Sequence, residues 1–213
     1  MARVLITSGP TREYLDPVRY LSNASSGRMG RAMAAAALGA GHEVVIVSGP
    51  VEVDYPAGAE VIPVVSTQEM LDACLKVFPQ CDGAIGVAAP CDYRSTAVAP
   101  HKLSKTGRSI RLELVQTPDI LATLAAEKTS QWIVAFALET EDGRARALKK
   151  LYEKHCDLIV LNGPAAIHGR DTAVEVLDPD GNVLASLSGT KDRVAEEVFR
   201  LIRERLISEY RPA

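Results

Sequence analysis

Residues 3–49 read RVLITSGPTREYLDPVRYLSNASSGRMGRAMAAAALGAGHEVVIVSG, and this stretch decides the fold class. The run RVLIT (3–7) is typical of a buried strand, and EVVIVSG (43–49) is typical of a second one. Between them, residues 25–41 have the composition of a helix that begins on serine and ends at glycine. A strand, a helix and a second strand in this order predict a parallel pair joined by a crossover helix.

The same alternation continues along the chain. We expect further strands at 59–65, 83–89, 110–115, 132–140 and 156–163, helices at 66–78, 117–128, 143–155 and 191–207, and a hairpin at 172–188. Ser66 with Glu69 forms a capping-box pattern, and Thr117 before Pro118 predicts another helix start. The fold class predicted is α/β: a Rossmann-like, doubly wound, mostly parallel sheet with helices on both faces and a C-terminal antiparallel hairpin. Residues 1–213 are expected to form a single nucleotide-binding domain, with the long polar loop 90–109 as a flap.

Composition excludes several classes of protein. The net charge is −3, which does not favour nucleic acid or a membrane surface as a partner. No apolar run approaches the roughly 20 residues that span a bilayer, and the N-terminus leads directly into a strand, so we expect no signal peptide. The four cysteines form neither a CxxC pair nor a zinc-site spacing, so we expect buried, reduced thiols in a cytoplasmic protein.

The start of the first helix has two interpretations. In the first interpretation, the unpaired amide groups and the helix dipole favour a bound anion at the helix start. Small residues would let a phosphate or substrate approach the backbone there, and they are Ser25, Ser26, Gly27 and Gly30. The alternative is a glycine-lined contact between helix and strand, and the spacing leaves both open. Asn23, just before the helix, is by itself more typical of an N-cap or an Asx-turn.

Basic residues gather in two further places. The loop after the strand at 83–89 contains Lys102 and Lys105, which are typical of a solvated loop but follow a strand end, where such sheets bind ligands. Lys150 and Lys154 lie four residues apart on one helix face, which is an ordinary pattern for an exposed helix. Among the residues of the chain there is no GxGxxG after the first strand, no GxxxxGK[ST] and no GxSxG.

Four motifs in this order resemble phosphopantothenoylcysteine synthetase. They are VLITSGPTREYLDPVRYLSNASSGRMG (4–30), AAPCDYRSTAVAPHKLSK (88–105), LVQTPDIL (114–121) and FALET (136–140). The pattern D-P-V-R-Y-x-S-N-x-S-S-G-[KR]-M-G is the most specific, and the chain carries it in full. The resemblance extends over nearly the whole chain. The decarboxylase domain that often precedes this one is missing, so the resemblance implies the stand-alone form.

The resemblance implies a phosphopantothenate–cysteine ligase of coenzyme A biosynthesis. Such an enzyme is an acid–amino-acid ligase that depends on ATP or CTP, and the bacterial pattern favours CTP. It activates the carboxylate of 4′-phosphopantothenate as an acyl-nucleotide and transfers the acyl group to the amine of cysteine. The resemblance further implies Mg²⁺ with the nucleotide, with metal ligands left unassigned, and a homodimer in which the loop containing Lys102 closes over the site together with the partner.

Carried over residue by residue, the family pattern gives Asn23 and Lys102 catalytic roles. Asn23 would donate its amide to the acyl oxygen, and Lys102 would stabilise charge at the reacting phosphate and carbonyl. The nucleotide-binding positions fall on Ala88, Ala89, Asp92, Lys105, Pro118, Asp119, Ile120, Leu121, Phe136, Lys150 and Lys154.

The chain departs from the family pattern at several positions that concern nucleotide or phosphate contacts. These are Pro10, Pro90, Cys91, Ser104, Gln116, Thr117, Gly163 and Ala173. Asn23 and Lys102 are retained, which indicates an active but divergent member. Two alternatives stay open: an NAD(P)-dependent oxidoreductase of the short-chain type, opposed by the missing glycine fingerprint and Tyr-x-x-x-Lys pair, and a non-catalytic nucleotide-binding paralogue.

Overall fold

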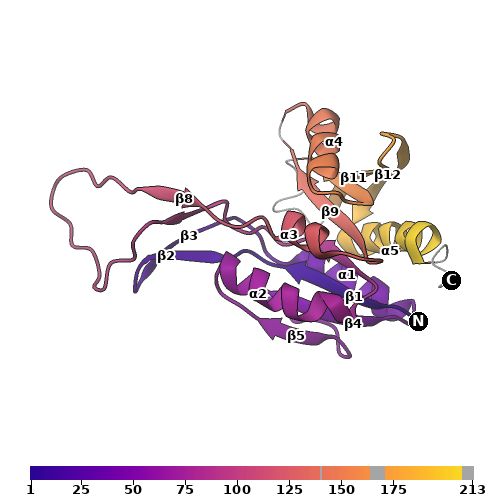
Figure 1. The fold of residues 1–213 in the computed structure, drawn as a ribbon, viewed down its shortest axis with the longest axis horizontal. Helices are drawn as coiled ribbons and strands as arrows, with labels where there is room; N and C mark the ends of the chain where they lie inside the picture. Colours follow the sequence, from indigo (N-terminus) through magenta and orange to yellow (C-terminus); the bar gives the residue numbers. More distant parts are fainter. Residues whose placement is uncertain (140, 164–170, 208–213) are drawn as a thin grey trace.

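A computed structural model describes residues 1–139, 141–163 and 171–207, and it contains an eight-stranded sheet in the order β12-β11-β10-β9-β6-β1-β4-β5 (Figure 1). Six strands run parallel: β1 (Arg3–Ser8), β4 (Glu43–Ser48), β5 (Glu60–Pro63), β6 (Gly83–Gly86), β9 (Trp132–Leu138) and β10 (Leu158–Asn162). The hairpin of β11 (Asp171–Leu177) and β12 (Val183–Thr190) joins β10 in antiparallel fashion. The predicted Rossmann-like fold class, including the terminal hairpin, is confirmed.

The winding of the chain reverses at β1. The chain adds β4 and β5 on one side of β1, then crosses and adds β6, β9 and β10 on the other side. Neighbouring loops therefore diverge at the carboxyl ends of β1 and β6, and open α/β sheets bind ligands at such a switch point.

Helices cover both faces of the sheet. α1 (Arg28–Gly39) and α5 (Lys191–Ile202) pack on one face, and a short π-helical turn, Arg203–Ile207, follows α5. α2 (Thr67–Val77), α3 (Ile120–Glu127) and α4 (Gly143–Glu153) pack on the other face. The two cores are separated by the sheet because alternate residues of each strand point to opposite faces. A short 3₁₀ helix, Phe78–Gln80, directly follows α2.

Three helix starts test the sequence signals. α2 has the predicted capping box, with Ser66 and Glu69 capping each other's backbone groups. α1 begins at Arg28 and not on serine, because Gly27 has a left-handed conformation (φ 73°) that cannot continue a helix. The predicted start of α3 at Thr117 is also wrong: Asp119 is the N-cap and accepts a hydrogen bond from the amide of Ala122.

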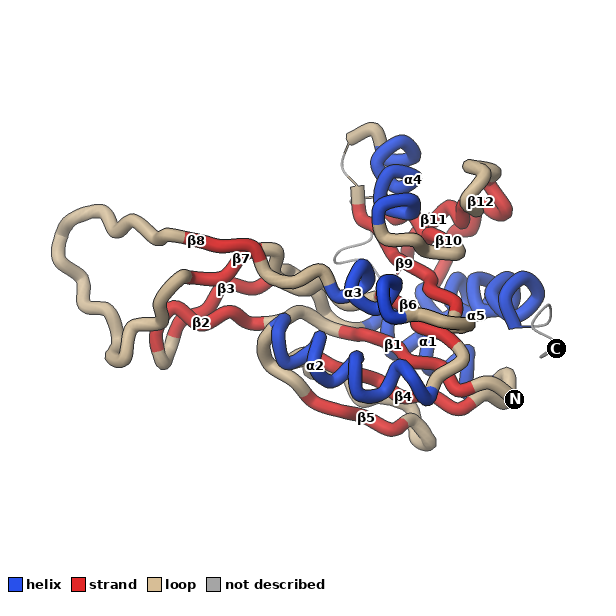
Figure 2. The backbone as a smooth tube through the Cα atoms, viewed as in Figure 1, coloured by secondary structure: helices blue, strands red, loops and turns tan. Residues whose placement is uncertain are grey.

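Two short hairpin-like sheets form an arm that projects from the body (Figure 2). β2 (Arg12–Asp16) pairs with β3 (Arg19–Ser22), and β7 (Tyr93–Ser95) pairs with β8 (Leu114–Gln116). The sequence predicted loops where β2, β3 and β7 lie. The strand predicted at 110–115 overlaps β8 but begins four residues too early. These strands are only three to five residues long, and their buried residues, Glu13, Asp16 and Ser95, are polar, so they lack the apolar alternation that marks a half-buried strand.

The arm leaves the body where β1 and β6 end. β2 follows β1 directly, and β7 follows the loop after β6. The loop 96–113 between β7 and β8 forms the far end of the arm, well away from α1 in both ribbon views (Figures 1 and 2). Within the arm, β2 and β3 are joined by an edge-to-face contact of Tyr14 with Tyr20 and by the guanidinium of Arg12, 4.6 Å from the centre of the Tyr20 ring.

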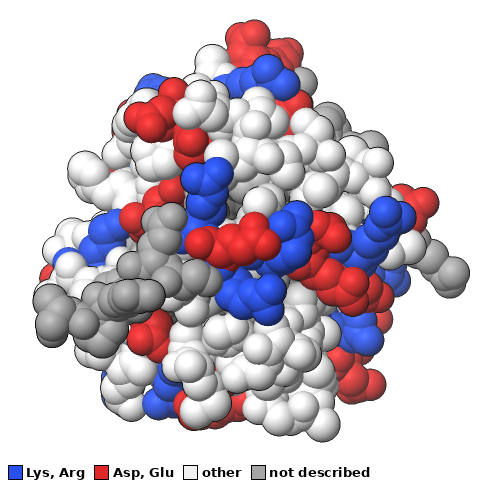
Figure 3. All heavy atoms as spheres, turned by 90° about the vertical axis from the view of Figure 1, so that its right-hand side faces the viewer, with Lys and Arg blue, Asp and Glu red and all other residues white. Residues whose placement is uncertain are grey.

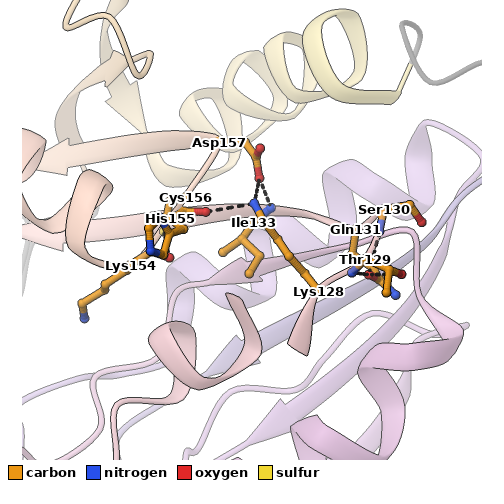
Figure 4. Close-up of polar contacts among 9 residues, drawn as sticks. All are labelled: Lys128, Thr129, Ser130, Gln131, Ile133, Lys154, His155, Cys156 and Asp157. Atoms are coloured by element: carbon orange, nitrogen blue, oxygen red, sulfur yellow. Dashed lines mark hydrogen bonds and ion pairs between the residues drawn. The ribbon is translucent and has the colours of Figure 1, made fainter. Parts of the chain in front are cut away.

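The amino ends of β9 and β10, at the end of the sheet away from the arm, are joined by a carboxylate. Asp157 accepts a hydrogen bond of 2.7 Å from the amide of Ile133, the second residue of β9, and lies 3.1 Å from the ammonium of Lys128, which also donates to the carbonyl of His155 (Figure 4). These contacts connect the end of α3 with β9 and the start of β10. On the face of the molecule turned away from the arm, acidic and basic side chains are interspersed (Figure 3). Over the described ranges, the helices are too short or too polar to cross a bilayer.

Candidate functional site

A cleft of about 510 Å³ lies at the carboxyl ends of the central strands. Its walls come from the loop before α1, the first turn of α1, the loop after β6, the end of β9, and one residue each from α4, β10, β11 and α5. The described lining residues are Asn23, Ala24, Ser25, Ser26, Gly27, Arg28, Met29, Gly30, Val87, Ala88, Ala89, Pro90, Asp92, Phe136, Ala137, Leu138, Lys150, Asn162, Thr172 and Lys191. The cleft therefore lies at the switch point that the strand order defines.

The start of α1 has both features that the sequence left open: a close glycine contact with a strand and amide groups that an anion could reach. A side chain at Gly30 would collide with Ser8 of β1, so Gly30 is the close helix–strand contact. Gly27 has φ 73°, and a Cβ there would lie 2.7 Å from Val51. Because Gly27 occupies the N-cap position, α1 has no side-chain cap, and its first turn contains no acidic residue. The amide groups that open α1 are thus available to an anion in the cleft.

Asn23 connects two walls of the cleft. Its side-chain nitrogen donates hydrogen bonds to the carbonyl oxygens of Pro90, at 2.8 Å, and Ala89, at 3.3 Å. Gly27 is the N-cap of α1, so the prediction of Asn23 as an N-cap is wrong. Its amide instead ties the loop before α1 to the loop after β6.

Five of the predicted nucleotide-binding residues line the same cleft as Asn23: Ala88, Ala89, Asp92, Phe136 and Lys150. The ammonium of Lys150 lies 2.7 Å from a carboxylate oxygen of Glu139, whose side chain is only 7% exposed. This ion pair fixes the Lys150 side chain at the rim of the cleft. The predicted phosphate-binding residues Ser25, Ser26, Gly27 and Gly30 line it as well.

The predicted segment Pro118–Leu121 and Lys154 do not belong to the described lining of the cleft. Ile120 is buried in the core, and the Leu121 side chain packs over Gly86 at the end of β6. Lys154 lies 2.9 Å from Asp119 in an ion pair that joins the end of α4 to the start of α3. In a single chain, Ile120 and Leu121 therefore pack in the interior, and Lys154 and Asp119 join two helices.

Lys102 and Lys105 lie in the loop 96–113 of the arm and are exposed, so a single chain does not bring them to the cleft. The next residue after Lys102 is anchored, because the amide of Leu103 donates to Asp16 at 3.1 Å. Asp16 is fully buried and also accepts from the amides of Val18 and Arg19, both at 2.9 Å. Burial raises the pKa of this carboxyl, but the three amides and the charge of Arg19 outweigh it, so the pKa lies below its usual range.

Cys91 is a structural residue at the base of the arm. Its amide donates to the hydroxyl of Thr11 at 2.8 Å, and its carbonyl accepts from the hydroxyls of Thr67 and Thr117. Burial raises the pKa of the thiol. These contacts join β2, α2 and the start of α3, which agrees with the interpretation of Cys91 as a buried thiol and not a nucleophile.

Four polar or basic lining residues were not predicted as site residues: Arg28, Asn162, Thr172 and Lys191. Arg28 follows Gly27 in the specific motif, and Asn162 and Thr172 stand beside Gly163 and Ala173, two of the departures from the family pattern. The sequence therefore carried a signal for these three residues but not for Lys191. Thr172 and Lys191 come from the C-terminal hairpin and helix, and only the folded sheet brings them to the cleft. Within the described part of the chain, no group of three or more His, Cys, Asp or Glu side chains is arranged to hold a metal ion.

Residues 1–206 match the model of a family described as DNA/pantothenate metabolism flavoprotein C-terminal domain. The chain belongs to this family. Similar curated proteins carry the name coenzyme A biosynthesis bifunctional protein CoaBC: that of Bacillus subtilis is 45% identical over 84% of this chain and 45% of its own length, and that of Vibrio cholerae is 40% identical over 96% and 53%. The chain spans about half the length of the curated relatives it matches.

Two solved structures have the same fold as this chain. The C-terminal domain of a CoaBC protein superposes with a TM-score of 0.84 at 38% identity, over 98% of this chain and 97% of that one. A Cab2 mutant in complex with phosphopantothenate-cysteine superposes with a TM-score of 0.78, over 97% of this chain and 87% of that one, at 16% identity. The second likeness concerns the fold alone. The family-level resemblance predicted from the four motifs is therefore confirmed.

Proposed function

We propose that this protein is a phosphopantothenate–cysteine ligase that acts in coenzyme A biosynthesis. One observation carries the proposal: the N-x-S-S-G end of the specific motif (23–27) and the loop after β6 meet in one cleft, where Asn23 donates hydrogen bonds to the carbonyls of Ala89 and Pro90. Membership of the family and the names of the CoaBC relatives support the same activity. The cleft also offers the amide groups of α1, which suit the phosphates of a nucleotide.

The chemistry needs activation because a carboxylate is a poor acyl donor. The carboxylate oxygen of 4′-phosphopantothenate attacks the α-phosphorus of the nucleoside triphosphate, and the bond to the bridging oxygen breaks, with its electron pair leaving on pyrophosphate. The amine of cysteine then attacks the acyl carbon and displaces the nucleoside monophosphate. Both steps build negative charge, which the start of α1, Asn23 and Lys102 would stabilise.

We favour CTP over ATP as the co-substrate and propose that Mg²⁺ enters with the triphosphate. Mg²⁺ in such sites is held mainly by phosphate oxygens and water, with one or two carboxylates from the protein. Asp92 is the one acidic residue among the described residues that line the cleft, so it would be the carboxylate nearest the metal. The ion would mask phosphate charge when bound.

We further propose a homodimer, because the arm carries a concentration of exposed apolar side chains. Val98, Ile110, Leu112, Leu114 and Val115 are each between 37% and 58% exposed. Exposed apolar patches of this kind mark protein–protein contacts. In a two-fold assembly the arm of one subunit would reach the cleft of its partner, and Lys102 would then act in trans.

The test is a pyrophosphate-release assay with 4′-phosphopantothenate, cysteine and each of CTP, ATP, GTP and UTP. We expect release that depends on phosphopantothenate, and formation of phosphopantothenoylcysteine when cysteine is added. Pyrophosphate release without cysteine would report the first half-reaction. Tight NADP(H) binding combined with no turnover of any triphosphate would contradict the proposal and favour the oxidoreductase alternative.

A further inference from the structure

Two cavities meet at Arg28 and Lys191. Both side chains line the cleft of about 510 Å³, and both also line a second cavity of about 650 Å³. Arg28 is the first residue of α1, and Lys191 is the first residue of α5. The second cavity contains one further basic side chain, Arg31, which lies 3.4 Å from Asp192 in an exposed ion pair. The junction of the two cavities is therefore built from two cations at two neighbouring helix starts.

A buried hydroxyl points to a ligand at this junction. Thr172 of β11 is only 6% exposed and lines the cleft, yet its Oγ1 has no hydrogen-bond partner. In the sheet, Thr172 pairs with Gly189 of β12, two residues before Lys191. Buried hydroxyls are normally hydrogen-bonded, because leaving one unpaired costs stability. Thr172 thus provides an unsatisfied donor beside Lys191.

The electrostatics of the junction favour an anion. Burial lowers the pKa of Lys191, and the positive charge of Arg28 lowers it further. The positive ends of the dipoles of α1 and α5 add to the same field. Asp192 in the first turn of α5 and Asp54, which lines the second cavity, offset part of this field. The first turn of α1 contains no acidic residue. A phosphate group that entered the junction could interact with both cations at once.

We propose that Arg28, Thr172 and Lys191 hold a phosphate group of a substrate where the two cavities meet. This inference rests on the proposed ligase function for the identity of the ligand. Two substrates of that reaction carry phosphate: the nucleoside triphosphate, whose distal phosphates leave as pyrophosphate, and 4′-phosphopantothenate. A site at the end of the cleft would take either phosphate, and Arg and Lys side chains with a hydroxyl are suited to both.

Binding measurements on the full chain separate these sources. Titration calorimetry with sodium pyrophosphate, CTP, CMP, 4′-phosphopantothenate and pantothenate would be compared for the wild type, Lys191→Met and the control Lys76→Met, which alters an exposed lysine of α2. We expect Lys191→Met to weaken at least one phosphate-bearing probe about tenfold or more, and Lys76→Met to change none. Loss for pyrophosphate and CTP but not CMP assigns the subsite to the nucleotide. Loss for phosphopantothenate but not pantothenate assigns it to the other substrate.

Two further variants distinguish a binding role from a structural one. Thr172→Val removes the unpaired hydroxyl at nearly constant shape, so we expect weaker phosphate binding with a melting temperature that is unchanged or raised. Lys191→Arg keeps the charge and should retain most of the affinity. Equal affinity of wild type and Lys191→Met for every phosphate probe would overturn the subsite, even if ligation proceeds normally. Phosphate binding that depends on Lys191 in a protein without ligase activity would support the subsite and reject the proposed function.

Discussion

The side-chain amide of Asn23 donates a 2.8 Å hydrogen bond to the carbonyl oxygen of Pro90. This contact crosses the cleft entrance between the loop before α1 and the loop after β6. It uses a backbone carbonyl, which proline retains, so the departure from the family pattern at position 90 removes only an N–H donor. The geometry also sets a condition on catalysis: the Asn23 amide must leave a carbonyl before it can donate to an acyl oxygen.

Asn23→Ala and Asn23→Asp should therefore differ. The alanine variant loses the donor, and we expect ligation to fall by about 10²–10³-fold with smaller changes in nucleotide affinity. The aspartate variant places a carboxylate against two carbonyl oxygens, so it should also displace residues 88–92 and weaken nucleotide binding. Single-turnover formation of acyl-nucleotide and calorimetric titration with CTP would separate the two effects. An alanine variant that loses only nucleotide affinity would contradict the catalytic role.

Lys102→Gln should reduce ligation by about 10²-fold or more, with little change in melting temperature, because the residue is exposed at the far end of the arm. Mixing this variant with Asn23→Ala tests whether the arm acts in trans. If each site takes Asn23 from one subunit and Lys102 from the other, random exchange of two-fold dimers should restore about a quarter of the sites. An active Lys102→Gln enzyme would remove this lysine from the mechanism. Absence of recovery after demonstrated subunit exchange would place both residues in one subunit's site.

Asp16→Asn should loosen the arm. The carboxylate accepts three amide hydrogen bonds, and an asparagine would turn an N–H₂ group toward at least one of those amides. Because the folded-state pKa of Asp16 is lowered, its contribution is present above the ordinary pKa of about 3.9 and is lost as pH falls through the lower folded-state value. The protection factors of the Val18, Arg19 and Leu103 amides, measured against the intrinsic exchange rate at the same pH, should fall in the variant at pH 7, and in the wild type only in strongly acidic solution. Unchanged exchange at Leu103 would show that other contacts anchor the loop.

The sheet was predictable and the arm was not, for physical reasons. Strands such as β1 and β4 are buried on both faces, so they appear as continuous apolar runs, and the capping box of α2 is a local signal. The buried residues of β2 and β7, Glu13, Asp16 and Ser95, are polar, and both strands pair with partners whose positions depend on the whole fold. The site divides in the same way. The specific motif located Asn23 and the start of α1, whereas Thr172 and Lys191 reach the cleft only because the C-terminal hairpin adds to the sheet beyond β10.

Gly30→Ala and Gly39→Ala form a matched pair within α1. A Cβ at position 30 would collide with Ser8, so α1 must move away from β1, and we expect a loss of about 1–3 kcal/mol in the free energy of unfolding. A Cβ at position 39 meets nothing within 4 Å, so alanine should be neutral or stabilise by up to about 1 kcal/mol. Urea denaturation of both variants would measure the difference. Equal stability of the two variants would indicate that the contact between Gly30 and Ser8 relaxes without cost.

The thiols should be unreactive in the native protein. Cys74, Cys81, Cys91 and Cys156 are all buried and unpaired with one another. Burial raises the pKa of Cys74 and of Cys156 to about 12, and that of Cys81 to about 11. At pH 8 a thiol of pKa about 12 is ionised in about one molecule in ten thousand, and only the thiolate reacts. We expect a disulfide reagent such as DTNB to label four thiols in urea and almost none in the native protein at pH 8. Rapid labelling of Cys91 alone would reveal opening at the base of the arm, where its thiol lies near the carbonyls of Thr11 and Leu21.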